Sequence, residues 1–103
     1  MKLLYITCSV SMQERIETLL RKHNPQSIQV IPKVLSESQV STPRRDDPIW
    51  PGYDVAFMVH AEDGIAEKIF SALRNLNERS YDESELVSGT MLNVTDSLLP
   101  EGR

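Results

Sequence analysis

The 103-residue sequence predicts an α+β fold in which two helices cover one face of a four-stranded antiparallel sheet. Three observations predict it. The length suits one domain with one core, and 40% hydrophobic with 25% charged residues is ordinary globular composition. Apolar residues also follow strand and helix periodicities in the order strand, helix, strand, strand, helix, strand. Residues 1–103 are therefore expected to form a single domain.

Residues 2–8 and 54–60 are predicted as the central strands, because apolar residues occupy both faces of each. In the first, Leu4 and Ile6 lie on one face and Tyr5 on the other. We expect the two strands to be parallel neighbours. Two helices can cover only one face of the sheet, so the other face is expected to be covered by another copy of the chain or by a ligand. The alternative is ordinary scattered exposure of apolar residues.

Two segments have the periodicity of amphipathic helices. The first is expected to start at Ser11, with Glu14 completing a capping box, and to end before Pro25. In the second, apolar residues recur at i, i+4, i+7, i+8 and i+11 over residues 65–76.

The remaining strands are predicted over residues 28–35, where Pro32 indicates an edge strand or a bulge, and over residues 90–98. The resulting order is βαββαβ, which is typical of the ferredoxin-like arrangement. Right-handed crossovers then place both helices on the same face of the sheet.

Charge and motifs exclude several classes of protein. The net charge of −4 and the pI near 5.1 argue against a nucleic-acid partner. Cys8 is the only cysteine and cannot form an intramolecular disulfide. The apolar start is too short for a signal peptide or membrane span, so a cytoplasmic location is expected. No catalytic or phosphate-binding motif occurs, and we expect no enzymatic activity.

A long loop over residues 36–53 is the most informative segment, because loops of this length in a compact domain are usually functional or disordered. Arg44 and Arg45 are candidates to contact an anionic ligand or partner. The two aspartates that follow them are the alternative neutralising partners. Trp50 is either a further contact residue or an apolar anchor that packs the base of the loop.

Cys8 and His60 are the candidate metal ligands. If their strands are parallel neighbours, the two residues lie at adjacent strand ends beside both helix N-termini, where the dipoles favour the thiolate. A Cys-His pair near methionines suits copper or zinc. The alternative is that Cys8 is a small buried hydrophobe and that His60 hydrogen-bonds a turn.

The element order, the Met-Lys start, the 36–53 insertion and the length make nearly the whole chain resemble the PII-like signalling family. The resemblance implies a homotrimer whose sheets pack around a threefold axis. It also implies that residues 36–53 act as a T-loop, which docks onto a partner protein such as a membrane transporter, and that a small-molecule effector binds between subunits. Gln39 stands where nucleotide-binding members place a glutamine.

This sequence departs from those members in the phosphate-binding segments. It lacks glycines before Gln39, and residues 77–85 are acidic instead of glycine-rich, which argues against ATP as the effector. The resemblance leaves a transition metal as the alternative cofactor. Two alternative functions follow from the same architecture: a CutA-like metal-binding trimer and a dimeric α/β-barrel enzyme.

Overall fold

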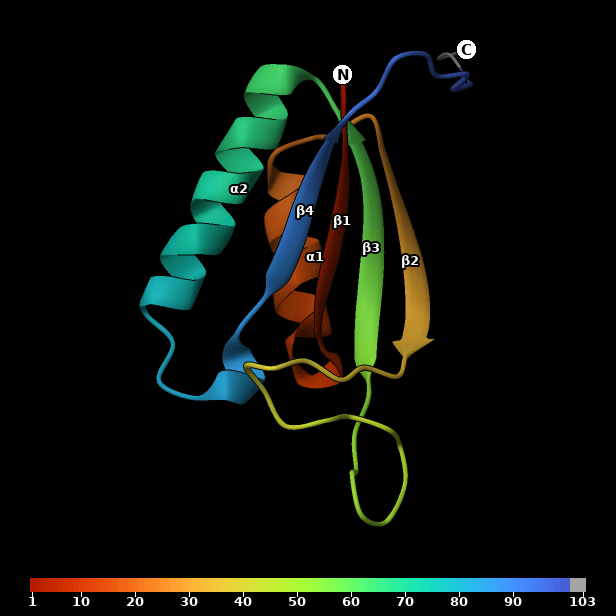
Figure 1. Cartoon of the computed structure of the whole chain (residues 1–103). Helices are drawn as coiled ribbons and strands as arrows, with labels where there is room; N and C mark the ends of the chain where they lie inside the picture. The colour runs from red at the N-terminus through yellow and green to blue at the C-terminus, as the bar shows by residue number, and fades with distance from the viewer. Residues whose placement is uncertain (101–103) are drawn as a thin grey trace.

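A computed structural model describes residues 1–100 and confirms the predicted α+β fold (Figure 1). Its helices and strands, with two short 3-10 helices η1 and η2, are β1 (Lys2–Ser9), η1 (Val10–Met12), α1 (Gln13–Lys22), β2 (Ser27–Val34), β3 (Asp54–Ala61), α2 (Asp63–Glu78), η2 (Glu83–Glu85) and β4 (Ser88–Asn93). No helix of this part of the chain has the length and apolarity that crossing a membrane requires.

The sheet has the strand order β2-β3-β1-β4, and every neighbouring pair is antiparallel. Leu4 of β1 lies opposite Val59 of β3 on one side and opposite Met91 of β4 on the other. The prediction that β1 and β3 are parallel is wrong. The chain crosses over through α1 to make β2 parallel to β1, and after the long loop it turns back, so β3 fills the gap between them in the opposite direction.

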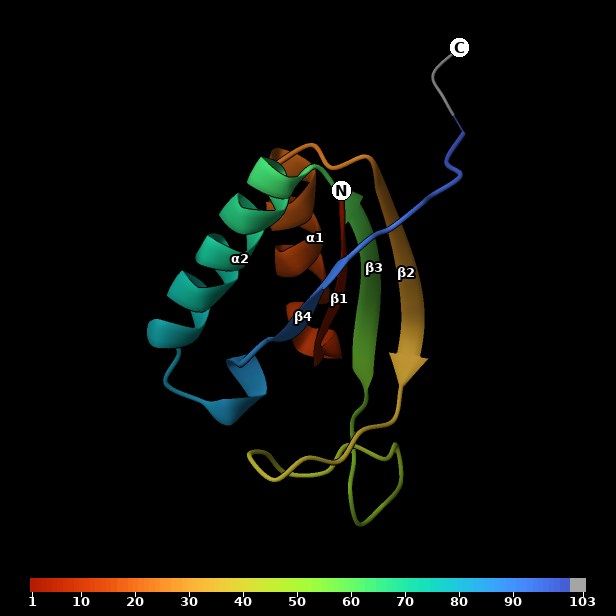
Figure 2. The same ribbon diagram turned by 45° about the horizontal axis from the view of Figure 1, so that its top comes forward.

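Both helices lie on the same face of the sheet (Figures 1 and 2). The residues that alternate along β1 and β3 toward the helices are inaccessible to solvent, among them Ile6, Phe57 and Val59. Ile16 of α1 and Ile69 of α2 are equally buried against them. Each such side chain contributes about 1.5–3 kcal/mol to folding by leaving water, so this layer holds the domain together.

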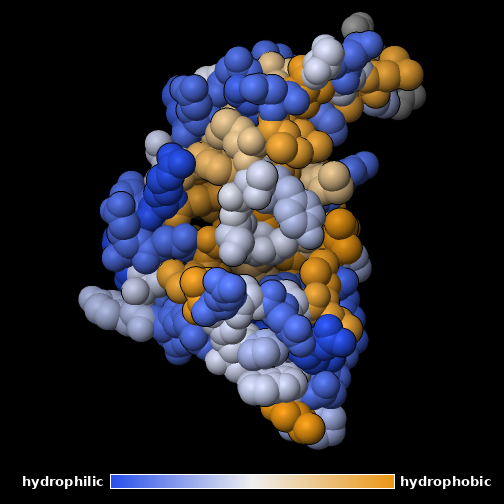
Figure 3. Space-filling view, viewed as in Figure 1, coloured by the Kyte–Doolittle hydropathy of each residue, from blue (hydrophilic) through white to orange (hydrophobic). Residues whose placement is uncertain are grey.

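No helix or strand of residues 1–100 covers the other face of the sheet (Figure 1). Tyr5 of β1 is 37% exposed there and Leu92 of β4 is 50% exposed, while Met58 of β3 is half-buried between its neighbours. Pale and hydrophobic side chains occupy the middle of this face, and hydrophilic ones lie toward its margins (Figure 3). The predicted apolar character of the second face is therefore present in part, with side chains of intermediate hydropathy between the hydrophobic ones.

The edge strand β2 confirms the expectation drawn from Pro32. Its register against β3 shifts between Ile31 and Val34, so the proline, which has no N–H to donate, lies in an irregularity at the sheet edge. The end of the first helix is also as expected. Asn24, before Pro25, adopts φ of 52°, outside the helical region.

Two predicted element boundaries are wrong. Ser11 does not cap the first helix; Ser9 caps η1 instead by accepting from the N–H of Ser11, and α1 starts at Gln13. The last strand starts at Ser88 and ends at Asn93, where its partner β1 also begins. Without a strand to pair with, the predicted continuation to residue 98 does not form.

Candidate ligand-binding site at the base of the long loop

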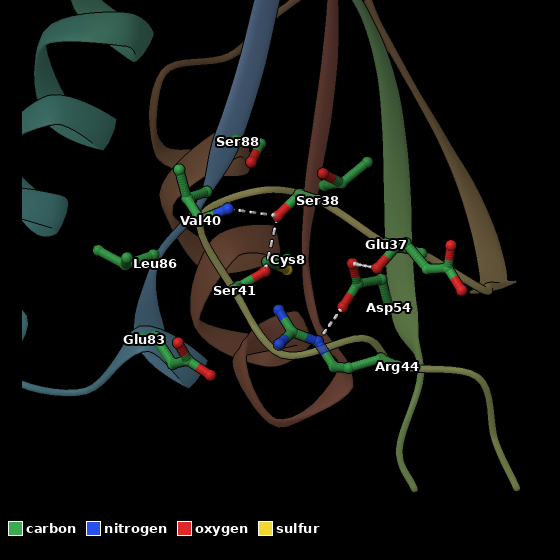
Figure 4. A pocket seen from close by; sticks show the side chains of 12 residues that line it. Cys8, Glu37, Ser38, Val40, Ser41, Arg44, Asp54, Glu83, Leu86 and Ser88 are labelled. Atoms are coloured by element: carbon green, nitrogen blue, oxygen red, sulfur yellow. Dashed lines mark hydrogen bonds and ion pairs between the residues drawn. The ribbon is translucent and has the colours of Figure 1, made fainter. Parts of the chain in front are cut away.

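A hollow of about 170 Å³, here called the loop-base pocket, lies where the long loop returns across the ends of the central strands (Figure 4). It is formed by β1, the first half of the loop, the start of β3, and the segment from η2 to β4. Its lining residues are Thr7, Cys8, Ser36, Glu37, Ser38, Val40, Ser41, Arg44, Asp54, Glu83, Leu86 and Ser88. Segments distant in sequence meet here because β1 and β3 are paired.

Arg44 fastens the loop to the sheet. Its Nε donates to Oδ1 of Asp54 at 2.5 Å, and the Ser36 hydroxyl donates to Oδ2 of the same carboxylate at 2.7 Å. The side chains of Arg44 and Asp54 are only 14% and 7% exposed. Arg44 and Ser36 also exchange both backbone N–H···O bonds, each 2.9 Å long. This group, here called the Arg44 clamp, closes residues 36–44 into a fixed base for the loop.

The Arg44 clamp leaves most of the guanidinium donors available. Only Nε is used in the ion pair, and the terminal Nη1 and Nη2 make no hydrogen bond or ion pair with any residue between 1 and 100. In Figure 4 these nitrogens turn away from Asp54 toward the side of the hollow where Ser41 and Glu83 lie. Their planar arrangement matches the two oxygens of a carboxylate or bicarbonate.

A second contact joins the loop to the acidic segment before β4. Oε1 of Glu83 accepts from both the N–H and the hydroxyl of Thr42, at 3.0 and 2.5 Å. These bonds stabilise the ionised carboxylate and lower the pKa of Glu83. The side chain of Glu83 is thereby committed to holding the loop while its negative charge remains beside Arg44.

Cys8 lies at the back of the pocket and is 2% exposed (Figure 4). Burial, and secondly the negative charge of Asp54, raise the pKa of the Cys8 thiol to about 12. The expectation that helix dipoles favour the thiolate is therefore wrong. A protonated thiol is a poor nucleophile and a poor metal ligand.

We expect iodoacetamide to alkylate Cys8 in the folded protein at pH 8 at least 100-fold more slowly than in urea. Mass spectrometry of timed samples measures the rates. Equal rates in the two solvents would contradict the assigned burial.

The same pKa makes the stability of the fold depend on pH in the alkaline range. Well below pH 9 the thiol is protonated in the folded and the unfolded chain, so it contributes no pH dependence to the free energy of unfolding. Between pH 9 and about 12 the unfolded chain releases this proton and the folded chain retains it, so Cys8 lowers stability as pH rises.

His60 is not near Cys8. In the antiparallel register Cys8 lies opposite Val55, whereas His60 lies opposite Leu3 at the other end of β1. His60 Nδ1 is 3.0 Å from the hydroxyl of Ser27. The two proposed ligands therefore cannot share one metal ion within a protomer. Residues 1–100 contain no cluster of three or more His, Cys, Asp or Glu side chains placed to hold a metal.

The second half of the loop, residues 45–52, forms a closed tip below the Arg44 clamp. Arg45 N–H donates to the Trp50 carbonyl at 3.0 Å, and the Asp47 carboxylate accepts from the N–H groups of Ile49 and Trp50 at 3.0 and 2.6 Å. Gly52, at φ of 82°, supplies a left-handed turn that only glycine adopts without strain. The tip presents Ile49, which is 78% exposed, and Trp50, which is 40% exposed.

Of the four loop residues predicted to bind a ligand, the structure places one in the loop-base pocket. Arg44 lines the pocket, whereas Gln39 and Arg45 do not, and Trp50 belongs to the tip and not to the base of the loop. The two aspartates after the arginines do not neutralise them: Asp46 pairs with Lys33, and Asp47 holds the tip.

Asp54 is a residue of this candidate site that was not predicted from the sequence. The signal was available: a carboxylate is the first residue of a strand whose other residues, apart from His60, are apolar, and a buried charge there requires a partner. Its partners, Ser36 and Arg44, lie in the loop that leaves the neighbouring strand. Only the folded structure shows that the three side chains meet.

No protein-family model and no curated sequence matches this chain. Solved structures do match its fold. The CPII protein of Thiomonas intermedia, bound to ADP, AMP and acetate, has a TM-score of 0.67 and 11% identity over 88% of this chain and 82% of its own. A protein of Thermus thermophilus described as PII-like signalling has a TM-score of 0.62 and 16% identity over 90% and 85%.

A third structure, the CutA1 protein of Pyrococcus horikoshii, has a TM-score of 0.60 and 12% identity over 95% and 87% of the two chains. The chain thus has the ferredoxin-like fold found in PII-like signalling proteins, as the sequence analysis expected. At these identities the likeness concerns the fold.

Proposed function

We propose that this protein is a PII-like regulatory protein that binds a small anionic effector in the loop-base pocket and engages a partner protein through the loop tip. The observation that carries the proposal is that one side chain, Arg44, both fixes the loop and lines the pocket. Its Nε fixes the loop to Asp54, and its free terminal nitrogens face the pocket. An anion bound there contacts the same side chain that sets the position of the loop.

Among anions, the pocket suits a small monoanion such as bicarbonate or a short carboxylate better than a polyphosphate. Arg44 is its only cation, against the carboxylates of Glu37, Asp54 and Glu83. A polyphosphate would bring several further negative charges close to these groups. A volume of about 170 Å³ is also below the roughly 300 Å³ of common ligand pockets. Acetate and bicarbonate are among the molecules bound in the CPII structures.

Thermal denaturation with sodium acetate, sodium bicarbonate, ADP or AMP tests the proposal, with sodium chloride at equal ionic strength and pH as reference. A small anion that binds the native state is expected to raise Tm by several degrees at saturation. Arg44→Lys keeps a positive charge near Asp54 but lacks the planar fork, and it should lose this shift. Arg45→Lys, on the same loop outside the pocket, is the matched control.

Two results would overturn the effector assignment: no shift with either small anion, or an undiminished shift in Arg44→Lys. A shift with ADP or AMP alone would replace the monoanion by a nucleotide. Calorimetric titration of the same ligands separates binding from nonspecific salt effects on stability.

We further propose that the assembly is a homotrimer in which the uncovered sheet face is buried between subunits. The exposed Tyr5 and Leu92 on that face support it. The CutA-like metal-binding alternative loses its candidate ligand pair, since Cys8 and His60 lie apart. The α/β-barrel alternative needs space between helices and sheet, where Phe57 and its neighbours are fully buried.

Replacing residues 46–51 by two glycines is expected to leave Tm within about 3 °C of wild type, because the Arg44 clamp remains. The same change should abolish binding of the partner protein, since it removes the exposed Ile49 and Trp50. Quantitative affinity purification from the native host compares wild type with the shortened loop. Equal recovery of every bound protein would place the partner surface elsewhere. A fall in Tm of 10 °C or more would instead show that the tip supports the fold.

A further inference from the structure

The two helices form a groove on the side of the helical layer that faces away from the sheet. Its volume is about 340 Å³, and it runs between α1 and α2. Leu19 and Ala72, both half-buried, and Leu76 give it an apolar floor. We call it the helix groove. It shares no residue with the loop-base pocket.

Basic residues border the helix groove, although the chain is acidic. Arg15, Lys22 and Arg79 line it, and no aspartate or glutamate does. Within residues 1–100 none of the three forms an ion pair, whereas four other basic side chains pair with carboxylates. With a net charge of −4 for the whole sequence, the remainder of the chain carries −7. The groove is a positive, partly apolar channel on a negative protein.

The dimensions of the groove suit a helix. Arg15 and Lys22 are seven residues apart on α1, which corresponds to about 10 Å along the helix axis. A neighbouring hollow shares His23, Ala72 and Asn75 with the groove and extends it along α2 to Glu67 and Lys68, whose charges balance. From Arg79 to Lys68 the two hollows follow eleven residues of α2, or about 16 Å. That is about three helical turns, the length over which an amphipathic helix places anchors at i, i+3, i+4 and i+7.

We propose that the helix groove binds an acidic amphipathic helix of a partner protein. Its apolar stripe covers Leu19, Ala72 and Leu76, and its flanking carboxylates pair with Arg15, Lys22 and Arg79. A flat anionic membrane reaches the cations on the rims but not the apolar floor between them. A nucleic acid meets the negative charge of the surrounding surface. The site lies on the opposite side of the fold from the uncovered sheet face, so it does not depend on the proposed function.

A displayed peptide library tests the proposal. Each 16-residue member has leucine fixed at i, i+4, i+7 and i+11, and its other positions vary among Glu, Lys, Gln and Ala. Selection on the immobilised full-length protein is expected to enrich glutamate. Fluorescence anisotropy then measures the affinity of the best peptides for wild type, for Arg15→Glu/Lys22→Glu/Arg79→Glu, and for the control Lys2→Glu/Arg74→Glu, whose residues lie outside the groove.

The triple charge reversal is expected to weaken binding at least tenfold, and the control less than twofold. Amide chemical shifts of Leu19, His23 and Asn75 should move on titration with the peptide. No enrichment, enrichment of lysine, equal affinity for the triple variant, or shifts confined to other residues would each overturn the proposal. So would stronger binding to phosphatidylserine vesicles or to single-stranded DNA than to any selected peptide. Circular dichroism confirms that both variants remain folded.

Discussion

Replacing Asp54 by alanine is expected to lower the free energy of unfolding by about 3 kcal/mol, because it leaves Arg44, whose side chain is only 14% exposed, without its counter-charge. The Ser36 hydroxyl loses its acceptor at the same time. In a domain of this size such a loss is a large part of the total stability. The loop base should then separate from the sheet, and the proposed anion should no longer bind.

Urea denaturation followed by circular dichroism measures this effect. The double variant Asp54→Leu/Arg44→Met removes both charges and is expected to regain more than half of the lost stability, because burying two apolar groups avoids the unpaired charge. Glu37→Ala removes the exposed partner of Arg45, at 4.0 Å, and should change stability by less than about 0.5 kcal/mol. A loss below about 1 kcal/mol in Asp54→Ala would mean that the ion pair contributes little.

Replacing Tyr5 and Leu92 together by glutamate is expected to convert a trimer into monomers. Both side chains project from the face of the sheet that the helices leave uncovered, at 37% and 50% exposure. Burial of each in an interface contributes about 1.5–3 kcal/mol, and six carboxylates around one axis would add repulsion and desolvation. The lost apolar burial and the added repulsion and desolvation should together exceed the free energy of association of the three subunits.

Sedimentation velocity distinguishes the outcomes. Wild type should sediment as a species of about three times 11.7 kDa, and the double variant near 11.7 kDa. Thr18→Glu/Ser71→Glu, which adds the same charge to exposed positions of the helical layer, should remain trimeric. A monomeric wild type would contradict the trimer and leave the sheet face free, and a dimer would revive the α/β-barrel alternative.

The periodicity of apolar residues and the positions of the prolines predicted the helices and strands and their order. Apolar spacing placed both helices, Pro32 placed its strand at the sheet edge, and the excess length before Asp54 identified the loop. These signals are local: they depend on which residues stand next to each other in one strand or one turn of helix. The errors at Ser11 and at the end of β4 concern element boundaries, which depend on the available caps and on the extent of the neighbouring strand.

Strand direction was the decisive error. A parallel pairing of β1 and β3 predicts that Cys8 and His60 lie close together. The antiparallel register of the structure places them at opposite ends of the strand pair. The same register brings Cys8 beside Asp54, and burial near that carboxylate keeps the thiol protonated. Because the two strands are antiparallel, Cys8 is not half of a metal site but a buried residue in the lining of the loop-base pocket.

The order of apolar and polar residues was enough to predict the α+β architecture, the long loop and the partly apolar second face of the sheet. Each of these follows from the spacing of residues that are near neighbours in the chain. The meeting of Ser36, Arg44 and Asp54, the closed loop tip and the basic groove between the helices became visible only in three dimensions. They depend on how segments far apart in sequence are brought side by side, and that is fixed by packing of the whole domain and not by any one segment.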